Sequence, residues 1–204
     1  MKIAIVDYNM GNLRSVQNAM QKIGYPTAIE KEPSRIGKYD KLILPGVGAF
    51  GDAMEHLQSS GMDEAIKEFA ASGKPLLGIC LGMQLLFKKS YEFGEHEGLG
   101  LIEGEVVPFD ISCFPHRLKV PHMGWNELFV QKPSPLLAGL PEAFYLYFVH
   151  SYHVACGEEQ TIGKTLYGYE FVSAVQRENI FGFQPHPEKS HDMGLKILKN
   201  FVEL

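Results

Sequence analysis

The stretch PLLGICLGMQLLFK, residues 75–88, decides the fold of this 204-residue chain. An apolar run over residues 75–79 ends at Cys80, which stands between Gly78 and Gly82, and an amphipathic segment over residues 81–88 follows at once. A buried strand that turns sharply into a helix, with a nucleophile at the corner, is a nucleophile elbow. The corner residue of such a turn is strained and other chain passes close to it, which explains the two glycines.

Cys80 is a candidate nucleophile because of its place in this turn. A helix that begins at Leu81 directs its free N–H groups and the positive end of its dipole at the sulfur, which favours the thiolate. The alternative is a buried structural cysteine in a strand–helix turn, since cysteine is commonly buried. A second segment of the chain favours the catalytic interpretation.

That segment is QPHPE, residues 184–188, close to the C-terminus. A nucleophilic cysteine needs a base, and the base needs a group that orients it. His186 and Glu188 are two residues apart, so they project to the same side of an extended chain, and the two prolines favour an extended chain. The alternative is a stiff surface loop with an incidental histidine. With Cys80 upstream, the pattern predicts a catalytic triad of Cys80, His186 and Glu188.

Composition argues against several classes of protein. The chain is 45% hydrophobic and 21% charged, which predicts one globular domain over residues 1–204. Its formal net charge of −5 gives no basic footprint for nucleic acid. No run of 18 apolar residues occurs and the N-terminus is typical of a strand, so neither a membrane span nor a signal peptide is expected. The cysteines, Cys80, Cys113 and Cys156, are widely spaced, which argues against a disulfide framework or a zinc site and fits a reducing cytoplasm.

Hydrophobic patterns predict the order of the elements. Apolar runs at 2–7, 27–30, 41–44 and 75–79 predict buried strands, and the segments 12–23, 53–57, 62–71 and 81–88 predict helices. This order predicts an α/β fold, with a mostly parallel sheet covered by helices on both faces. After Gly94, strand-like segments at 99–109, 118–120, 127–130, 144–155 and 162–168 and a hairpin at 171–183 predict antiparallel additions in the C-terminal half, before a last helix at 191–203.

The GICLG elbow, the Gln84 that follows it and the distant His-Pro-Glu resemble the class I glutamine amidotransferases over the whole chain. Four more segments, DYNMGNLRS (7–15), PGVGAF (45–50), PHMGWN (121–126) and YFVHSY (147–152), are similar within that family to the glutaminase subunits of imidazole glycerol phosphate synthases. The resemblance implies a flavodoxin-like α/β fold and hydrolysis of L-glutamine to glutamate and ammonia without a cofactor. It also implies a heterodimer with a barrel-shaped cyclase subunit, which receives the ammonia in histidine biosynthesis.

Acyl transfer needs hydrogen-bond donors for the oxyanion of its tetrahedral intermediate. Elbow geometry assigns one donor to the N–H of Leu81, directly after the nucleophile. The other is expected from residues 46–48, at the carboxyl end of an earlier parallel strand, where α/β sheets build their sites. The resemblance assigns this second donor to the N–H of Val47, after a rotation of its peptide. An ordinary glycine-rich turn is the alternative.

The resemblance places five further residues around the glutamine: Gly48, Gln84, Glu92, Ser151 and Tyr152. Glu92 would pair with the substrate ammonium, and backbone groups near Ser151 would take its carboxylate. The alternatives are a polar residue on a helix surface for Gln84 and a solvated loop charge for Glu92.

The resemblance also places Asn12, Lys189 and the segment that contains Trp125 near the surface for the partner. That segment is rich in Pro, Gly and His, which argues against a core strand, although a core aromatic is the alternative for Trp125. His150 and His153 are three apart in an expected strand, so they would face opposite sides and would not chelate one metal together. We expect them to be structural, and we predict no metal site.

Three other functions compete with this one. The first is a glutaminase subunit of another synthase of the same fold, such as that of pyridoxal phosphate synthase, whose oxyanion strand differs from PGVGAF. The second is a non-catalytic or sensory relative, against which the presence of all three triad residues argues. The third is a cysteine hydrolase for peptides, which would be active in isolation. Glutamate release from glutamine, with and without partner chains, separates these alternatives.

Overall fold

Five parallel strands form the part of the sheet that carries Cys80. A computed structural model describes residues 1–204. The strands β1 (Ile3–Val6), β2 (Ala28–Glu30), β3 (Lys41–Gly46), β4 (Leu76–Cys80) and β13 (Ile180–Phe183) lie in the order β2-β1-β3-β4-β13, and each neighbouring pair is parallel. This is the doubly wound order of flavodoxin-like folds, which bind ligands outside the carboxyl ends of the strands.

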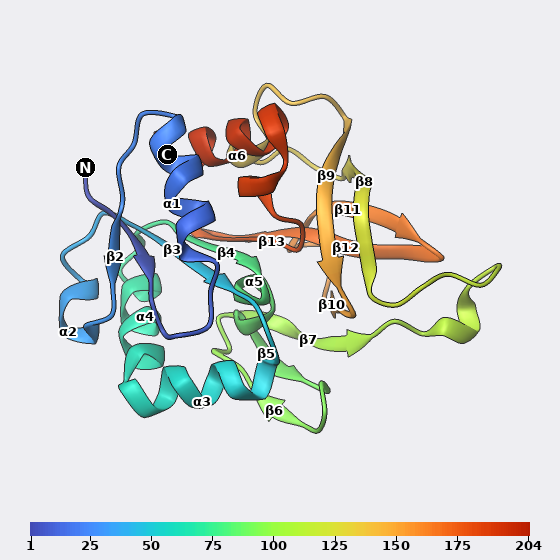
Figure 1. Ribbon diagram of the computed structural model, residues 1–204, viewed down its shortest axis with the longest axis horizontal. Coiled ribbons are helices and arrows are strands. Elements are labelled where there is room, and N and C mark those ends of the chain that lie inside the picture. Colours follow the sequence, from blue (N-terminus) through green and yellow to red (C-terminus); the bar gives the residue numbers. More distant parts are fainter.

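Helices cover both faces of this parallel part (Figure 1). The helices α1 (Leu13–Lys22) and α6 (His191–Glu203) pack on one face, and α2 (Pro33–Ile36), α3 (Phe50–Ser60), α4 (Met62–Ala71) and α5 (Leu81–Leu85) pack on the other. Strand β1 shows why, because Ile3 and Ile5 join the core under α1 and α6 whereas Ala4 and Val6 join the core on the other face. A strand buried on both faces is apolar throughout.

Antiparallel strands extend the sheet beyond β13. β12 (Tyr169–Arg177), β10 (Tyr152–Ala155) and β7 (Ile102–Pro108) follow in turn, each antiparallel to its neighbour, before β5 (Phe87–Ser90) and β6 (His96–Glu97). A branch of β11 (Thr161–Tyr167), β8 (His122–Val130) and β9 (Ala143–His150) leaves from β12. The predicted α/β fold with antiparallel additions in the C-terminal half is confirmed.

Three local predictions are wrong. The predicted helix 81–88 ends at Leu85, because residues 87–90 pair with β7 as the strand β5. Residues 118–120 are not a strand, and the expected strand 144–155 is broken at Ser151 into β9 and β10. The segment around Trp125, which composition argued against as a core strand, forms the start of β8 with Trp125 exposed. The short helix α2 and the strand β6 had no prediction.

A close backbone contact explains the glycines of the elbow. Cys80 has φ 56° and ψ −115°, a conformation that is unfavourable for a residue with a side chain. A Cβ on Gly82 would overlap the carbonyl oxygen of Leu44, and a Cβ on Gly78 would lie 2.6 Å from the carbonyl oxygen of Gly82. Helix α5 therefore packs backbone against backbone on β3 and β4, as the sequence predicted.

We predict that Gly82→Ala lowers the free energy of unfolding by about 3 kcal/mol or more, because the rigid backbone of β3 cannot move away from the added methyl group. Gly37→Ala is the matched control, since Gly37 has a helical φ of −62° and open space around its Cα; it should change stability by less than about 1 kcal/mol. Urea unfolding of both variants measures these changes in the free energy of unfolding. Similar midpoints for the two variants would contradict the close-packing argument.

Candidate active site

One cavity of about 370 Å³ opens at the carboxyl ends of the parallel strands. The register of the sheet creates it, because Gly46 pairs with Cys80 and Ile79 pairs with Phe183, so the chain segments that follow β3, β4 and β13 meet. Nine of the predicted site residues line the cavity: Val47, Gly48, Cys80, Leu81, Gln84, Glu92, Ser151, Tyr152 and His186. A larger, acidic hollow of about 610 Å³ beside it shares Glu92 but holds no nucleophile, so we take the smaller cavity as the site.

His186 and Glu188 form a buried pair behind Cys80. Nδ1 of His186 lies 2.8 Å from Oε1 of Glu188, and the two side chains are 2% and 1% exposed. The carboxylate therefore keeps the proton on Nδ1, so Nε2, which has no hydrogen-bond partner, is left to act as a base. Burial disfavours the imidazolium, but the neighbouring Cys80 and Glu188 outweigh burial and raise the pKa of His186 to about 10.

The two expected oxyanion donors directly follow the neighbouring strands β4 and β3. Leu81 is the first residue of α5 and follows Cys80 directly. The N–H of Val47 instead donates to the carbonyl of Met10 at 3.2 Å, in the loop between β1 and α1. This N–H points away from the sulfur, so it reaches an oxyanion only after its peptide rotates. Gly48, with φ +100°, is a neighbour that permits such a rotation.

Gln84 and Glu92 line the cavity but already have partners in the protein. Nε2 of Gln84 donates to the carbonyl of Tyr152 at 3.1 Å and to Oε1 of Gln184 at 2.9 Å. Oε2 of Glu92 accepts from the N–H of Phe50 at 2.7 Å, at the start of α3, and burial raises the pKa of Glu92. Gln84 is 5% exposed and Glu92 is partly buried, so neither is an ordinary surface residue. Their substrate contacts remain predictions.

The cavity also contains residues to which the sequence assigned no part in catalysis or substrate binding. Pro121, Val149 and His150 line it, and the amide of Gln184 donates to Sγ of Cys80 at 3.8 Å. A signal for Gln184 was present, because it is two residues before His186, as His186 is two before Glu188.

The three predicted interface residues lie around the His186–Glu188 pair. Asn12, at the start of α1, lies with Val47 and Glu188 around a narrow packing gap. Trp125 is 47% exposed, which excludes the core alternative, and its ring stacks on His191 with centroids 5.0 Å apart. Lys189 lies 5.9 Å above the ring of Tyr147, which also contacts Trp125. Their role in an interface remains a prediction.

The prediction that His150 and His153 face opposite sides is wrong. The chain bends at Ser151, between β9 and β10, so both imidazoles pack against Phe109, with ring centroids 5.2 and 4.9 Å away. His150 instead pairs with His122, whose Nδ1 lies 2.9 Å from its Nε2. Burial lowers the pKa of His122 to about 4, and burial together with the neighbouring His122 lowers that of His150 to about 3.

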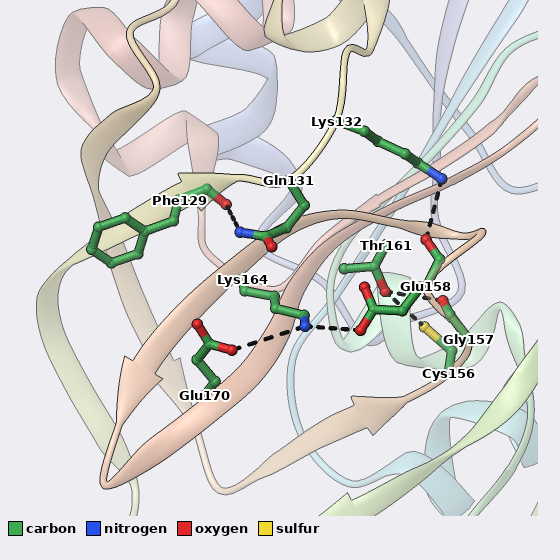
Figure 2. Close-up of polar contacts among 9 residues, drawn as sticks. All are labelled: Phe129, Gln131, Lys132, Cys156, Gly157, Glu158, Thr161, Lys164 and Glu170. Atoms are coloured by element: carbon green, nitrogen blue, oxygen red, sulfur yellow. Dashed lines mark hydrogen bonds and ion pairs between the residues drawn. The ribbon is translucent and has the colours of Figure 1, made fainter.

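The two other cysteines lie outside this site. Sγ of Cys156 contacts the hydroxyl of Thr161 at 3.8 Å, in a corner where Lys164 pairs with Glu158 at 2.9 Å (Figure 2). Burial raises the pKa of the Cys156 thiol, and Asp110 raises that of the exposed Cys113. All three thiols are free.

No cluster of three His, Cys, Asp or Glu side chains could hold a metal ion. No helix combines the length and apolarity needed to cross a membrane.

Fold and site together define a class of enzyme, and comparison with known proteins agrees. Residues 4–204 match the family model for Glutamine amidotransferase class-I, so the chain belongs to that family. Solved structures share the fold: PurLQS from Thermotoga maritima, at 20% identity and a TM-score of 0.78, covers 99% of this chain and 97% of that chain. A glutamine amidotransferase from the same organism, at 14% identity and a TM-score of 0.66, covers 100% of this chain and 81% of that chain.

Much more similar relatives narrow the family. The chain is 66% identical over 203 residues to the imidazole glycerol phosphate synthase subunit HisH of Wolinella succinogenes, covering 99% of both chains. It is 70% identical over 202 residues to the HisH subunit of Sulfurimonas denitrificans, covering 98% of this chain and 97% of the relative. The HisH subunit of Aquifex aeolicus is 48% identical over 203 residues, covering 98% of this chain and 96% of the relative. Within the class-I glutamine amidotransferases, this chain belongs with the HisH subunits.

We predict that the buried histidine pair makes the protein acid-sensitive. In the unfolded chain histidines bind protons near pH 6.5, whereas in the folded protein His122 and His150 have pKa values of about 4 and about 3. The contribution of this pair to the free energy of unfolding is therefore fully present above about pH 6.5 and falls as the pH is lowered towards 4. His122→Gln removes one titrating group and should lower the slope of unfolding free energy against pH by about 1 kcal/mol per pH unit. Urea unfolding at several pH values measures the slope. The exposed His116→Gln is the control and should keep the wild-type slope.

Proposed function

We propose that this chain is the glutaminase subunit of an imidazole glycerol phosphate synthase in histidine biosynthesis. It hydrolyses L-glutamine to L-glutamate and ammonia, and residues 1–204 act as one glutaminase domain. The observation that supports this most is the meeting of Cys80, at a strained strand–helix corner, with His186 in one cavity, where the buried Glu188 holds the imidazole from behind. The identity to HisH subunits selects this synthase among the enzymes that share the fold.

The triad residues take distinct roles in the reaction. The thiolate of Cys80 attacks the side-chain amide carbon of glutamine, and its former proton resides on His186. The tetrahedral intermediate collapses to a thioester as His186 gives that proton to the departing ammonia. His186 then takes a proton from water, which attacks the thioester and expels Cys80 as a thiolate. The glutamate side-chain carboxyl loses its proton to solvent, and the thiolate–imidazolium pair is restored. Glu188 orients the imidazole and stabilises its positive charge throughout.

The Val47 peptide controls when this chemistry occurs. In the described arrangement its N–H is bonded to the carbonyl of Met10, so the oxyanion has only the Leu81 N–H available. Rotation of the peptide exchanges the Met10 bond for one to the oxyanion, and one such donor is typically worth about 10²–10³ in rate. The isolated chain is therefore a slow glutaminase, which avoids the waste of glutamine when no acceptor of ammonia is present.

A cyclase subunit with a barrel shape is the partner that accepts the ammonia and makes imidazole glycerol phosphate and aminoimidazole carboxamide ribotide. It covers the face around Asn12, Trp125 and Lys189, where Trp125 and Met123 are 47% and 61% exposed. Aromatic residues and methionine are enriched at the centres of such interfaces. The heterodimer works in the cytoplasm, where the free thiol of Cys80 stays reduced.

Cys80→Ala should abolish glutamine hydrolysis and leave the ammonia-dependent synthesis of the cyclase partner intact, because the cysteine only supplies ammonia. Glutamate release and imidazole glycerol phosphate formation, measured with glutamine and then with an ammonium salt, test both halves. Cys113→Ala is the control, since this exposed thiol lies outside the cavity. Substantial glutaminase turnover by the purified Cys80→Ala variant would refute the proposed function.

Val47→Pro should lose most of the turnover that the partner and its ligand stimulate, on the order of 10²–10³-fold, because proline has no N–H to offer the oxyanion. Val47→Ala keeps the N–H and should respond like the wild type. Glutaminase rates at saturating partner and ligand measure the effect, with folding and partner binding verified for each variant. Normal stimulation of Val47→Pro would show that the second donor lies elsewhere.

A further inference from the structure

Gln184 lies against the nucleophile and has no role in the mechanism above. It directly follows β13, the neighbour of β4, so the parallel register brings it beside Cys80. Its side chain is completely buried, and Nε2 donates to Sγ of Cys80 at 3.8 Å. Its backbone N–H is bonded to the carbonyl of Ser173 at 2.9 Å, which holds the residue in place.

The direction of this amide is determined by its neighbours. The carbonyl oxygen of Tyr152 can only accept, so the atom of Gln84 that lies 3.1 Å from it must be Nε2. The same Nε2 lies 2.9 Å from the amide of Gln184, which must therefore present its oxygen to Gln84. Only Nε2 of Gln184 then remains to face the sulfur. A flipped Gln184 would bring two donors together and place an oxygen against the sulfur.

Two histidines in a hydrogen-bonded chain provide the second donor to the carbonyl oxygen of Tyr152. Nδ1 of His150 donates to this carbonyl at 2.8 Å, so Nε2 of His150 accepts from Nδ1 of His122 at 2.9 Å. Nε2 of His122 in turn accepts from the amide of Asn126 at 3.1 Å. The Tyr152 oxygen thus accepts from both His150 and Gln84, and its bond to Gln84 holds the Gln84 amide in this orientation.

We propose that Gln184 is a further catalytic residue, whose amide N–H stabilises the thiolate of Cys80, and that Gln84 is the positioning residue that aims this amide. The proposal rests on the proposed function in one respect, that Cys80 reacts as a thiolate. A hydrogen bond to a charged form favours that form. The bond is needed because Sγ also contacts the carbonyl oxygen of Val149 at 3.8 Å, an acceptor that favours the protonated thiol.

Few charges compete with this amide at the sulfur. The titratable groups around Cys80 are His186 with Glu188 behind it, Tyr8 from the loop after β1, His150 from β9, Tyr152 from β10 and Glu92 across the cavity. No lysine or arginine lines the cavity. His186 is thus the one group there that carries a positive charge when it takes the thiol proton, and the Gln184 amide adds a neutral donor on the sulfur itself.

The rate at which iodoacetamide alkylates Cys80, followed between about pH 5 and pH 10, tests the proposal, since only the thiolate reacts. Mass spectrometry of the labelled peptide separates Cys80 from Cys113 and Cys156. Gln184→Met keeps the length of the side chain and removes the donor. We expect the midpoint of its pH profile to rise by about 1 pH unit, so that alkylation on the acidic side of the midpoint is about tenfold slower at a given pH while the plateau at high pH is unchanged.

Gln160→Met is the matched control, because Gln160 is also a buried glutamine, 7% exposed, and lies outside the cavity. Its profile should coincide with that of the wild type. Gln184→Glu keeps the shape of the side chain and its acceptor for Gln84, but sets an oxygen against the sulfur. It should raise the midpoint at least as much as Gln184→Met, and it carries the test if the methionine variant does not fold.

A folded Gln184 variant with the wild-type midpoint would overturn the proposal, even if its alkylation were slower at every pH, since that pattern marks a structural role. Gln84→Leu should move the midpoint in the same direction by a smaller amount, because the Gln184 amide is then free to flip. An unchanged midpoint with a raised KM for glutamine would restrict Gln84 to substrate binding and refute its positioning role. Alkylation needs neither glutamine nor partner, so failure of the proposed function would leave this result interpretable.

Discussion

The contact between the backbone of Gly82 and the carbonyl of Leu44 is the constraint on which the site depends. It allows α5 to begin directly on top of β3 and β4, and it forces Cys80 into a conformation that residues with side chains rarely adopt. The surrounding sheet compensates for that strain, since β4 lies between β3 and β13 and all five of its residues are buried. The sulfur is therefore held at the mouth of a cavity by a rigid core.

The parallel register then determines what can meet the sulfur. Gly46 ends β3 opposite Cys80, so the peptide of Val47 lies on one side of the nucleophile. Phe183 ends β13 opposite Ile79, so Gln184 and His186 lie on the other. Residues far apart in sequence are thus placed by strand pairing, which varies little, while only short loops after the strands need to provide the chemistry.

Local patterns predicted the parts of this arrangement that local forces determine. The elbow and the spacing of His186 from Glu188 are visible in sequence, because a glycine-flanked turn and an alternating extended chain need no distant partner. The parallel strands were predictable from their continuous apolar runs. Helix α5 was predicted too long, since Phe87 and Ser90 join a distant strand, β7, whose pairing no local pattern reveals. The bend at Ser151 and the partners of Gln84 depend on tertiary contacts for the same reason, so the sequence misjudged His150 and His153 and assigned no role to Gln184.

The site is preassembled except at one peptide. The imidazole is oriented by Glu188, the sulfur is fixed in its strained corner, and the amide network around Tyr152 is complete, but the N–H of Val47 is bonded to Met10. A single neutral hydrogen bond contributes only about 1 kcal/mol net, so a modest preference of the partner for the rotated peptide is enough to shift the equilibrium. Met10 precedes Asn12 in the loop that leads into α1, and Asn12 belongs to the face proposed for the partner. In the proposed function, contact with that face would act on the loop that retains the Val47 N–H, and would link the arrival of an ammonia acceptor to completion of the oxyanion hole without any movement of the triad.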